Sequence, residues 1–202
     1  MGNKVTGNKG RISGTIAILI AGIVLIVAGA VLTVIFLLNP GEEKIDWTLT
    51  LVGKDGQEKV LGYDEVKDLP SVKARGGFFS TVGVVYGPYD IKGVPVKTLC
   101  DLVGGFTADD ILFVSAQDGY SSVYDYDQVD GNIDTFTSDP IKLAPHTEIQ
   151  FILMYEQEGQ PLAQADGRPL RLAIACPDEL ITEGHWWVRW VDRIEIRNLP
   201  EN

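Results

Sequence analysis

The sequence DGRPLRL at Asp166–Leu172 predicts a turn that leads directly into a β-strand. Glycine and proline favour turns, because glycine tolerates a positive φ and proline fixes its own φ. The apolar run Leu170–Ala175 is typical of a strand and contains a single charge, Arg171. Arg171 therefore lies at a junction between turn and strand. Its simplest expected role there is an ion pair with an acid such as Asp118 or Asp166.

Further strands are predicted on both sides of this stretch, from alternating, β-branched and aromatic residues. They lie at Trp47–Val52, Glu58–Leu61, Phe78–Tyr86 with an interruption at Gly83, Ile111–Ala116, Tyr120–Tyr126, Ile149–Tyr155 and Trp187–Ile196. Apolar residues at helical spacing from Val96 to Val103 predict one amphipathic helix, and Asp64 is a candidate cap for a shorter one. Because strands dominate without regular alternation with helices, we expect an α+β fold.

A long uncharged segment, residues 12–38, precedes these elements. A bilayer core of about 30 Å needs roughly 20 helical residues, so this segment is long enough to span it. Apolar residues continue past the only small-residue site, Ala28–Ala30, which favours an uncleaved anchor over a signal peptide. We therefore expect one transmembrane helix at 12–38.

Charges on either side of the segment set its expected orientation. Lys4, Lys9 and Arg11 precede it, and Glu42 and Glu43 follow it. Cations near a membrane helix stay on the cytoplasmic side. The predicted organisation is a cytoplasmic N-terminus at 1–11, the helix at 12–38, a stalk at 39–44 and an extracytoplasmic domain at 45–202.

The outer domain is strongly acidic. The chain has 17 Lys and Arg against 28 Asp and Glu, and the three cations before the helix leave the outer domain a formal charge of −14. Nucleic acids are bound through clusters of Lys and Arg, so we expect no nucleic-acid partner. The acidity is typical of a solvated surface.

The residues that most often bind metals are few and scattered. Cys100, Cys176, His146 and His185 show no metal-ligand spacing, so no metal site is expected. Both cysteines lie in apolar runs, where a free thiol behaves as a small hydrophobe, and whether they pair stays open. The sequence signatures of common hydrolases and of P-loop nucleotide-binding proteins are absent.

Four segments, in this order, resemble the molybdopterin-binding oxidoreductase domain of the sulfite-oxidase-like family. They are YDIKGVPVKTL at Tyr89–Leu99, Ile111–Tyr120, LMYEQEGQPL at Leu153–Leu162, and Asp166–Leu172 followed by WVRW at Trp187–Trp190. The resemblance covers nearly all of the outer domain. It implies a strand-rich sulfite-oxidase-like fold.

The resemblance also implies which residues would hold a cofactor. In that family a His and an Arg of the motif HGxPxR hold the phosphate of the pterin, together with a basic residue near the last Trp. The Arg corresponds to Arg171 and the later basic residue to Arg189, both suited to forked contact with phosphate. Asp118 falls near an acidic cofactor contact of the family.

Two positions depart from the family pattern. Asp166 stands where the family has its His and would place a carboxylate beside a phosphate. Thr81 stands where the family has the Cys that binds molybdenum, and a hydroxyl does not replace a thiolate. We therefore expect no bound cofactor, with molybdopterin implied by resemblance only, and no catalytic residue is identified.

The expected function is a membrane-anchored binding or partner module. Its ligand would be a small anion, or a membrane or extracytoplasmic protein. The alternative is a working molybdopterin-dependent oxidoreductase. A pocket lined by Trp186, Trp187 and Trp190 with Arg189 is conceivable, but strand alternation favours a core face shared by Trp186, Val188 and Trp190.

Overall fold

The computed structural model describes residues 44–145, 148–176 and 178–199. The chain divides into two units, Met1–Lys44 and Ile45–Asn202, and the described residues belong almost wholly to the second. The predicted cytoplasmic segment and transmembrane helix, and most of the stalk, lie outside the described residues. Within the described ranges, no helix is long and apolar enough to cross a bilayer.

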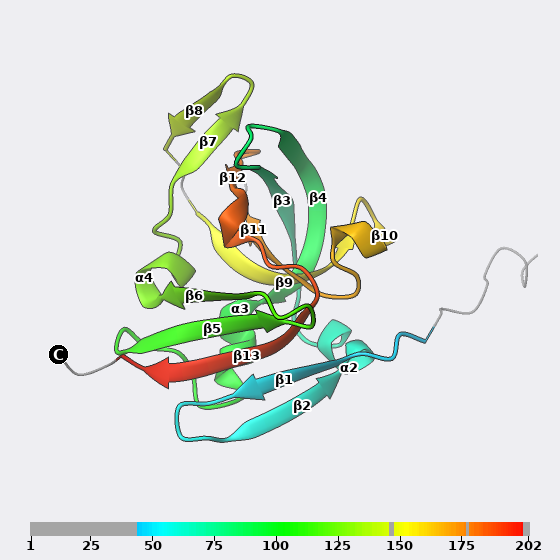
Figure 1. Cartoon of the computed structure of the whole chain (residues 1–202), viewed down its shortest axis with the longest axis vertical. Helices are drawn as coiled ribbons and strands as arrows, with labels where there is room; N and C mark the ends of the chain where they lie inside the picture. Colours follow the sequence, from blue (N-terminus) through cyan, green and yellow to red (C-terminus); the bar gives the residue numbers. More distant parts are fainter. Residues whose placement is uncertain (1–43, 146–147, 177, 200–202) are drawn as a thin grey trace, which may run out of the picture. The chain divides into compact units, whose positions relative to one another are not determined.

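One sheet brings the two ends of the domain together (Figure 1). Its strands, in spatial order, are β2 (Glu58–Gly62), β1 (Thr48–Val52), β13 (Val191–Asn198), β5 (Asp110–Ala116) and β6 (Ser121–Asp125). β1 and β13 run parallel, and the other pairs are antiparallel. Leu112 and Val114 on β5 are fully buried while Ile111, Phe113 and Ser115 beside them are only partly buried, as expected of a half-buried strand.

In the second sheet, the last two residues of the motif DGRPLRL begin the most buried strand. Its order is β10 (Gln160–Pro161), β9 (Gln150–Gln157), β4 (Val85–Pro95), β3 (Val72–Phe79) and β12 (Thr182–Glu183), and β11 (Arg171–Ala175) also pairs with β9. Every residue of β11 is buried. A continuous apolar run is the pattern of a strand covered on both faces, which explains why alternation is absent here.

The remaining elements are short. The helices are α2 (Tyr63–Lys67), α3 (Val96–Asp101), α4 (Tyr126–Val129) and the 3₁₀ turns η1 (Gln164–Asp166) and η2 (Gly184–Trp186), and β7 (Thr135–Ser138) and β8 (Ile141–Ala144) form a separate hairpin. Strands thus dominate, and the fold is strand-rich as predicted. α3 buries Val96, Leu99 and Cys100, which confirms the predicted amphipathic helix.

The strand predicted at Phe78–Tyr86 is interrupted at Gly83 as expected, and the interruption is the turn of a hairpin: Gly83 takes a φ of 78° and donates its N–H to the carbonyl of Ser80 at 2.8 Å. One local prediction was wrong. Asp64 does not cap α2. The helix begins at Tyr63 after Gly62, so Asp64 lies in its first turn.

Asp110 at the start of β5 is the one fully buried acid among the described residues. It accepts hydrogen bonds from Thr107 N at 2.9 Å and Thr107 Oγ1 at 2.7 Å, and pairs with Lys54 Nζ at 3.2 Å. Burial by itself would raise the pKa of Asp110, but the bonds from Thr107 and Lys54 outweigh it and lower the pKa. The carboxylate is therefore charged and serves the fold.

Candidate anion-binding site

A single backbone bridge brings Arg171 and Arg189 together. Leu172, the second residue of β11, donates its N–H to the carbonyl of Val188 at 2.8 Å and accepts the reciprocal bond at 3.2 Å. Arg171 and Arg189 are neighbours of the bridged residues on the two facing segments. The predicted cations therefore meet, although the sequence separates them by a loop and a strand.

Gly167 fixes the position of Arg189. Its φ is 102°, in the left-handed region that favours glycine. A Cβ placed on Gly167 would lie 3.0 Å from Cβ and 3.1 Å from Cα of Arg189, closer than ordinary contact. Any larger residue at 167 would push Arg189 away. This packing gives the glycine of DGRPLRL its physical reason.

The guanidinium of Arg171 is buried against a pair of aromatic rings whose centres are 5.0 Å apart. Its carbon lies 4.8 Å from the ring centre of Phe78 and 5.0 Å from that of Trp187, and the residue is only 4% exposed. Nη1 donates to the main-chain carbonyl of Asp166 at 3.3 Å, while the buried Nε has no hydrogen-bond partner. Burial, reinforced by the charge of Arg189, lowers the pKa of Arg171 to about 10.

Arg171 thus remains a cation at neutral pH, and no carboxylate of the described residues forms an ion pair with it. The predicted ion pair with Asp118 or Asp166 is wrong. Asp166 offers its carbonyl oxygen, and Asp118 lies on the pocket wall. A buried charge costs several kcal/mol unless it is compensated, and an anion bound beside Arg171 would provide that compensation.

A pocket of about 290 Å³ opens beside this guanidinium. Its charged lining residues are Arg171, Arg189 and Asp118. Asp118 is exposed and accepts the N–H of Tyr120 at 3.0 Å, which fixes the turn between β5 and β6. Three of the four residues predicted as cofactor contacts by resemblance therefore line one pocket.

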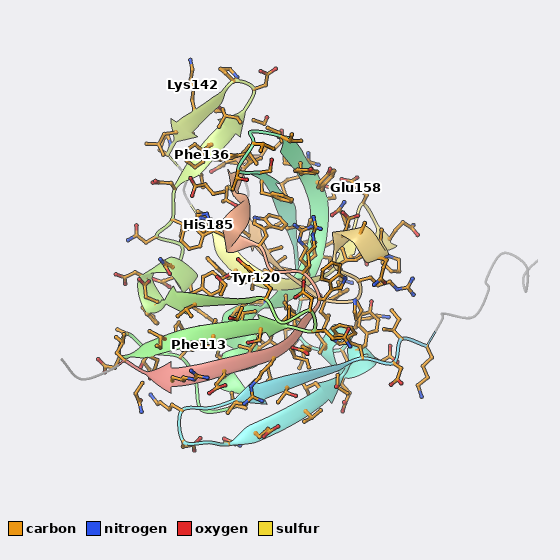
Figure 2. The ribbon with its side chains drawn as sticks, viewed as in Figure 1. Phe113, Tyr120, Phe136, Lys142, Glu158 and His185 are labelled. Carbon is orange, nitrogen blue, oxygen red and sulfur yellow. The ribbon has the colours of Figure 1, made fainter. Side chains whose placement is uncertain are left out.

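The other walls are aromatic. They are formed by Phe78, Tyr120, Trp187 and Trp190, with Gly184 between them. Tyr120, labelled in Figure 2, projects from the β5–β6 turn and is 49% exposed, so its ring is free to border a ligand. Trp187 is held from behind, because its Nε1 donates to Thr182 Oγ1 at 2.9 Å.

The predicted core face of Trp186, Val188 and Trp190 was wrong for Trp190. Val188 is fully buried and the partly buried Trp186 packs against the core, but Trp190 does not belong to it, and Trp187 is the buried tryptophan. The alternation fails because Trp186 lies in η2 and because Trp190 has a φ of 56°. Trp190 Nε1 donates to the carbonyl of Gln164 at 3.2 Å, which holds its ring at the pocket.

Thr81 lies elsewhere. It is an exposed residue of the turn between β3 and β4, and it does not line the pocket. Cys100 and Cys176 are free and buried, and neither lines the pocket. Burial raises the pKa of Cys100 to about 12, so this thiol stays protonated. The described residues also contain no cluster of three or more His, Cys, Asp or Glu side chains able to share a metal ion.

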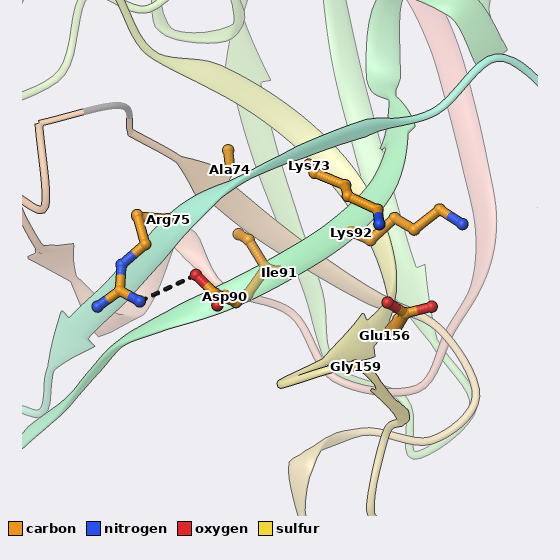
Figure 3. Close-up of a pocket in the computed structure, with 8 residues that line it drawn as sticks. All are labelled: Lys73, Ala74, Arg75, Asp90, Ile91, Lys92, Glu156 and Gly159. Carbon is orange, nitrogen blue, oxygen red and sulfur yellow. Dashed lines mark hydrogen bonds and ion pairs between the residues drawn. The ribbon is translucent and has the colours of Figure 1, made fainter.

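A larger hollow of about 580 Å³ lies between β3, β4 and the start of β10 (Figure 3). Two of its three cations have an acidic neighbour: Arg75 Nη1 donates to Asp90 at 2.9 Å, and Lys92 stands opposite Glu156 in the strand register. The third, Lys73, is exposed to solvent. The side chain of Arg75 is also 33% exposed, so water solvates its charge. The smaller pocket is therefore the better candidate, because its guanidinium is both buried and unpaired.

Sequence reasoning missed Phe78, Tyr120 and Gly184 as pocket residues. Nothing in the local pattern distinguishes them, because they come from three separate segments that only the tertiary structure brings together. The tryptophan cluster was a usable signal. It was assigned to the core, and the cation that it contacts is Arg171 rather than Arg189.

Comparison with known proteins places this geometry in a family. Residues 38–202 match the family described as the oxidoreductase molybdopterin binding domain. The fold resembles the crystal structure of the sulfane dehydrogenase SoxCD from Paracoccus pantotrophus, with a TM-score of 0.57 and 16% identity. The alignment covers 79% of this chain and 40% of that chain, so this chain spans less than half of its structural relative. No curated protein sequence gives a significant match.

The residues of the pocket suit only part of the molybdopterin cofactor that the family name implies. Arg171 and Arg189 suit the phosphate of a pterin, and their arrangement fits that role. The described lining residues, however, include no thiol for a molybdenum ion. The residues present therefore suit a small anion and do not fit the whole cofactor.

Proposed function

Because this chain belongs to the oxidoreductase molybdopterin-binding domain family, we propose that it retains the family's anion site without its metal chemistry. In this proposal it is a membrane-anchored extracytoplasmic binding domain that holds a small anion between Arg171 and Arg189. No residue of the domain is assigned a catalytic role.

One observation carries the proposal. The guanidinium of Arg171 is 4% exposed, yet its only hydrogen bond to a described residue goes to a neutral carbonyl oxygen. Arg189 adds a second positive charge at the same pocket and further disfavours the charged form of Arg171. Two cations that repel each other beside a cavity are stabilised together when an anion binds between them.

The membrane location in the proposal is supported by the sequence. Residues 12–38 carry no charge, cations precede them and acids follow them. Alkaline carbonate extraction of membranes tests this part: the full chain should remain in the pellet, while a chain that begins at Glu42 should be released. A full chain released by carbonate would contradict the anchor.

The cofactor part is tested with the full chain, purified in detergent from a host that makes molybdopterin. Molybdenum is measured by mass spectrometry, and pterin by the fluorescence of its oxidised form. We expect neither at stoichiometric amounts, because no thiol lines the described pocket. Stoichiometric molybdenum would instead favour an active molybdopterin-dependent oxidoreductase.

The binding part is tested by thermal melts in increasing concentrations of sodium benzoate and of inorganic phosphate. A ligand at 100 times its Kd stabilises the folded chain by about 2.7 kcal/mol, which raises Tm by several degrees. We expect a rise that Arg171→Met abolishes. Melts that neither anion shifts would refute the anion site.

A further inference from the structure

We infer that the ligand of the Arg171 pocket is a compact monocarboxylate with a flat, apolar body. The inference rests on the proposed anion site and narrows it, since the site as proposed would accept any small anion. Three features of the pocket lead to it: the unpaired donor of the guanidinium, the balance of charges and the aromatic walls.

The guanidinium of Arg171 keeps an unpaired donor. Phe78 and Trp187 lie against it at 4.8 Å and 5.0 Å from its carbon, and their ring centres are themselves 5.0 Å apart, so both rings pack on one side of the guanidinium. Nη1 is engaged with the carbonyl of Asp166, and the buried Nε has no hydrogen-bond partner among the described residues. The N–H donors of a guanidinium lie in one plane and match the two oxygens of a carboxylate.

The charge of the pocket matches a single negative charge. Two guanidinium groups and the carboxylate of Asp118 leave an excess of one positive charge among the lining residues. A phosphate dianion would exceed this balance, and Asp118 would repel its second charge. A monoanion is neutralised without that repulsion.

The walls select an apolar, flat body. The rings of Phe78, Trp187, Trp190 and Tyr120 border a space of about 290 Å³. Aromatic rings stack on flat surfaces and give little to a compact, strongly hydrated ion such as phosphate. The volume leaves room for a body about the size of one ring beside the carboxylate, and too little for a large cofactor.

Isothermal titration calorimetry of the detergent-purified full chain tests the inference with four probes. Benzoate carries both the ring and the carboxylate, acetate lacks the ring, benzamide lacks the charge, and inorganic phosphate is a hydrated anion. We expect benzoate to bind at least about tenfold more tightly than each of the other three.

Three variants make the result specific. Arg171→Met and Arg171→Lys should both weaken benzoate binding by at least about tenfold, because neither provides two parallel donors. Asp118→Asn should improve phosphate binding relative to benzoate. Arg197→Met is the matched control: it removes an exposed guanidinium that contacts Phe113 and does not line the pocket, and binding should stay unchanged.

The outcomes separate the inference from the proposal on which it rests. Phosphate binding as tightly as benzoate, with loss in Arg171→Met, would overturn the monocarboxylate inference and leave the anion site intact. Acetate equal to benzoate would overturn the role of the aromatic walls. The absence of binding by benzoate, acetate and phosphate would overturn both statements.

Discussion

Replacing Arg171 by methionine should leave the ligand-free domain at least as stable as the wild type. This is an unusual expectation for a residue that is 4% exposed, because most changes at buried positions destabilise. It follows from the unpaired state of the guanidinium. Methionine has a similar length, fills irregular spaces and contacts aromatic rings favourably.

The magnitude follows from opposing contributions. Burial and Arg189 lower the pKa of Arg171 from 12.5 to about 10, and one pKa unit equals about 1.36 kcal/mol, so the charged form costs about 3 kcal/mol in the folded chain. The contacts with Phe78 and Trp187 return about 1–2 kcal/mol, and the bond to Asp166 about 1 kcal/mol. Methionine loses these contributions and removes the cost. The expected change in the free energy of unfolding is therefore between about 0 and +2 kcal/mol, including the contact of methionine sulfur with the rings.

Urea unfolding followed by tryptophan fluorescence measures this change. Arg193→Met serves as the control, because Arg193 has a half-exposed side chain that pairs with Glu195 and should lose less than about 1 kcal/mol. The pKa of Arg171 is lower in the folded chain than in the unfolded one, so its cost is constant below about pH 10 and is relieved only above it. The difference between variant and wild type should thus be the same at pH 6 and pH 9. A loss of more than about 2 kcal/mol would show that Arg171 has a stabilising polar partner, and the anion site would lose its main support.

Three other predictions follow from the described contacts. Asp110→Ala should lower the free energy of unfolding by about 2–3 kcal/mol, because it leaves the donors that surround the carboxylate without an acceptor. Because the pKa of Asp110 is lower in the folded chain than its unfolded value near 3.8, the carboxylate contributes its full stability above that unfolded pKa and loses it as the pH falls through the folded pKa. Urea titrations at pH 7 and pH 3 should therefore show a smaller loss of stability on acidification in Asp110→Ala than in the wild type. Gly167→Ala should lower the free energy of unfolding by about 1–2 kcal/mol and weaken benzoate binding, since a Cβ there displaces Arg189. Gly159→Ala is its control: this glycine has a φ of 72° and no atom within 4 Å of an added Cβ, so the substitution should cost stability alone. Equal losses of binding in the two variants would contradict the argument. Cys100 and Cys176 should react with a thiol reagent only after unfolding, because both are buried and the pKa of Cys100 is about 12, and rapid labelling of the folded chain would contradict their burial.

The sequence alone determined most of the secondary structure. Strand patterns at Ile111–Ala116 and Ile149–Tyr155 correspond to β5 and β9, and the helical spacing from Val96 corresponds to α3. These elements were predictable because their periodicity is local and reflects which face is buried. The resemblance of four ordered segments also identified the family, which the match over residues 38–202 confirms.

Local patterns failed where the backbone takes a conformation that the spacing of apolar residues cannot reveal. The positive φ of Trp190 took its ring out of the predicted core face. Such conformations are set by contacts such as the bond from Trp190 Nε1 to the carbonyl of Gln164, which is distant in sequence.

The sequence predicted Arg171, Arg189 and Asp118 as members of one site, but only the tertiary structure decided whether Arg171 has a charged partner. Its charge predicted an ion pair, because a carboxylate is the usual partner of a buried cation. Whether a carboxylate reaches the guanidinium depends on the packing of β11 against the segment at Val188, and that packing places Phe78 and Trp187 against it. The sequence shows that Arg171 is charged. Whether an acid neutralises that charge depends on distances between segments that come together only when the chain folds, and in the folded chain Arg171 is a buried cation beside a cavity.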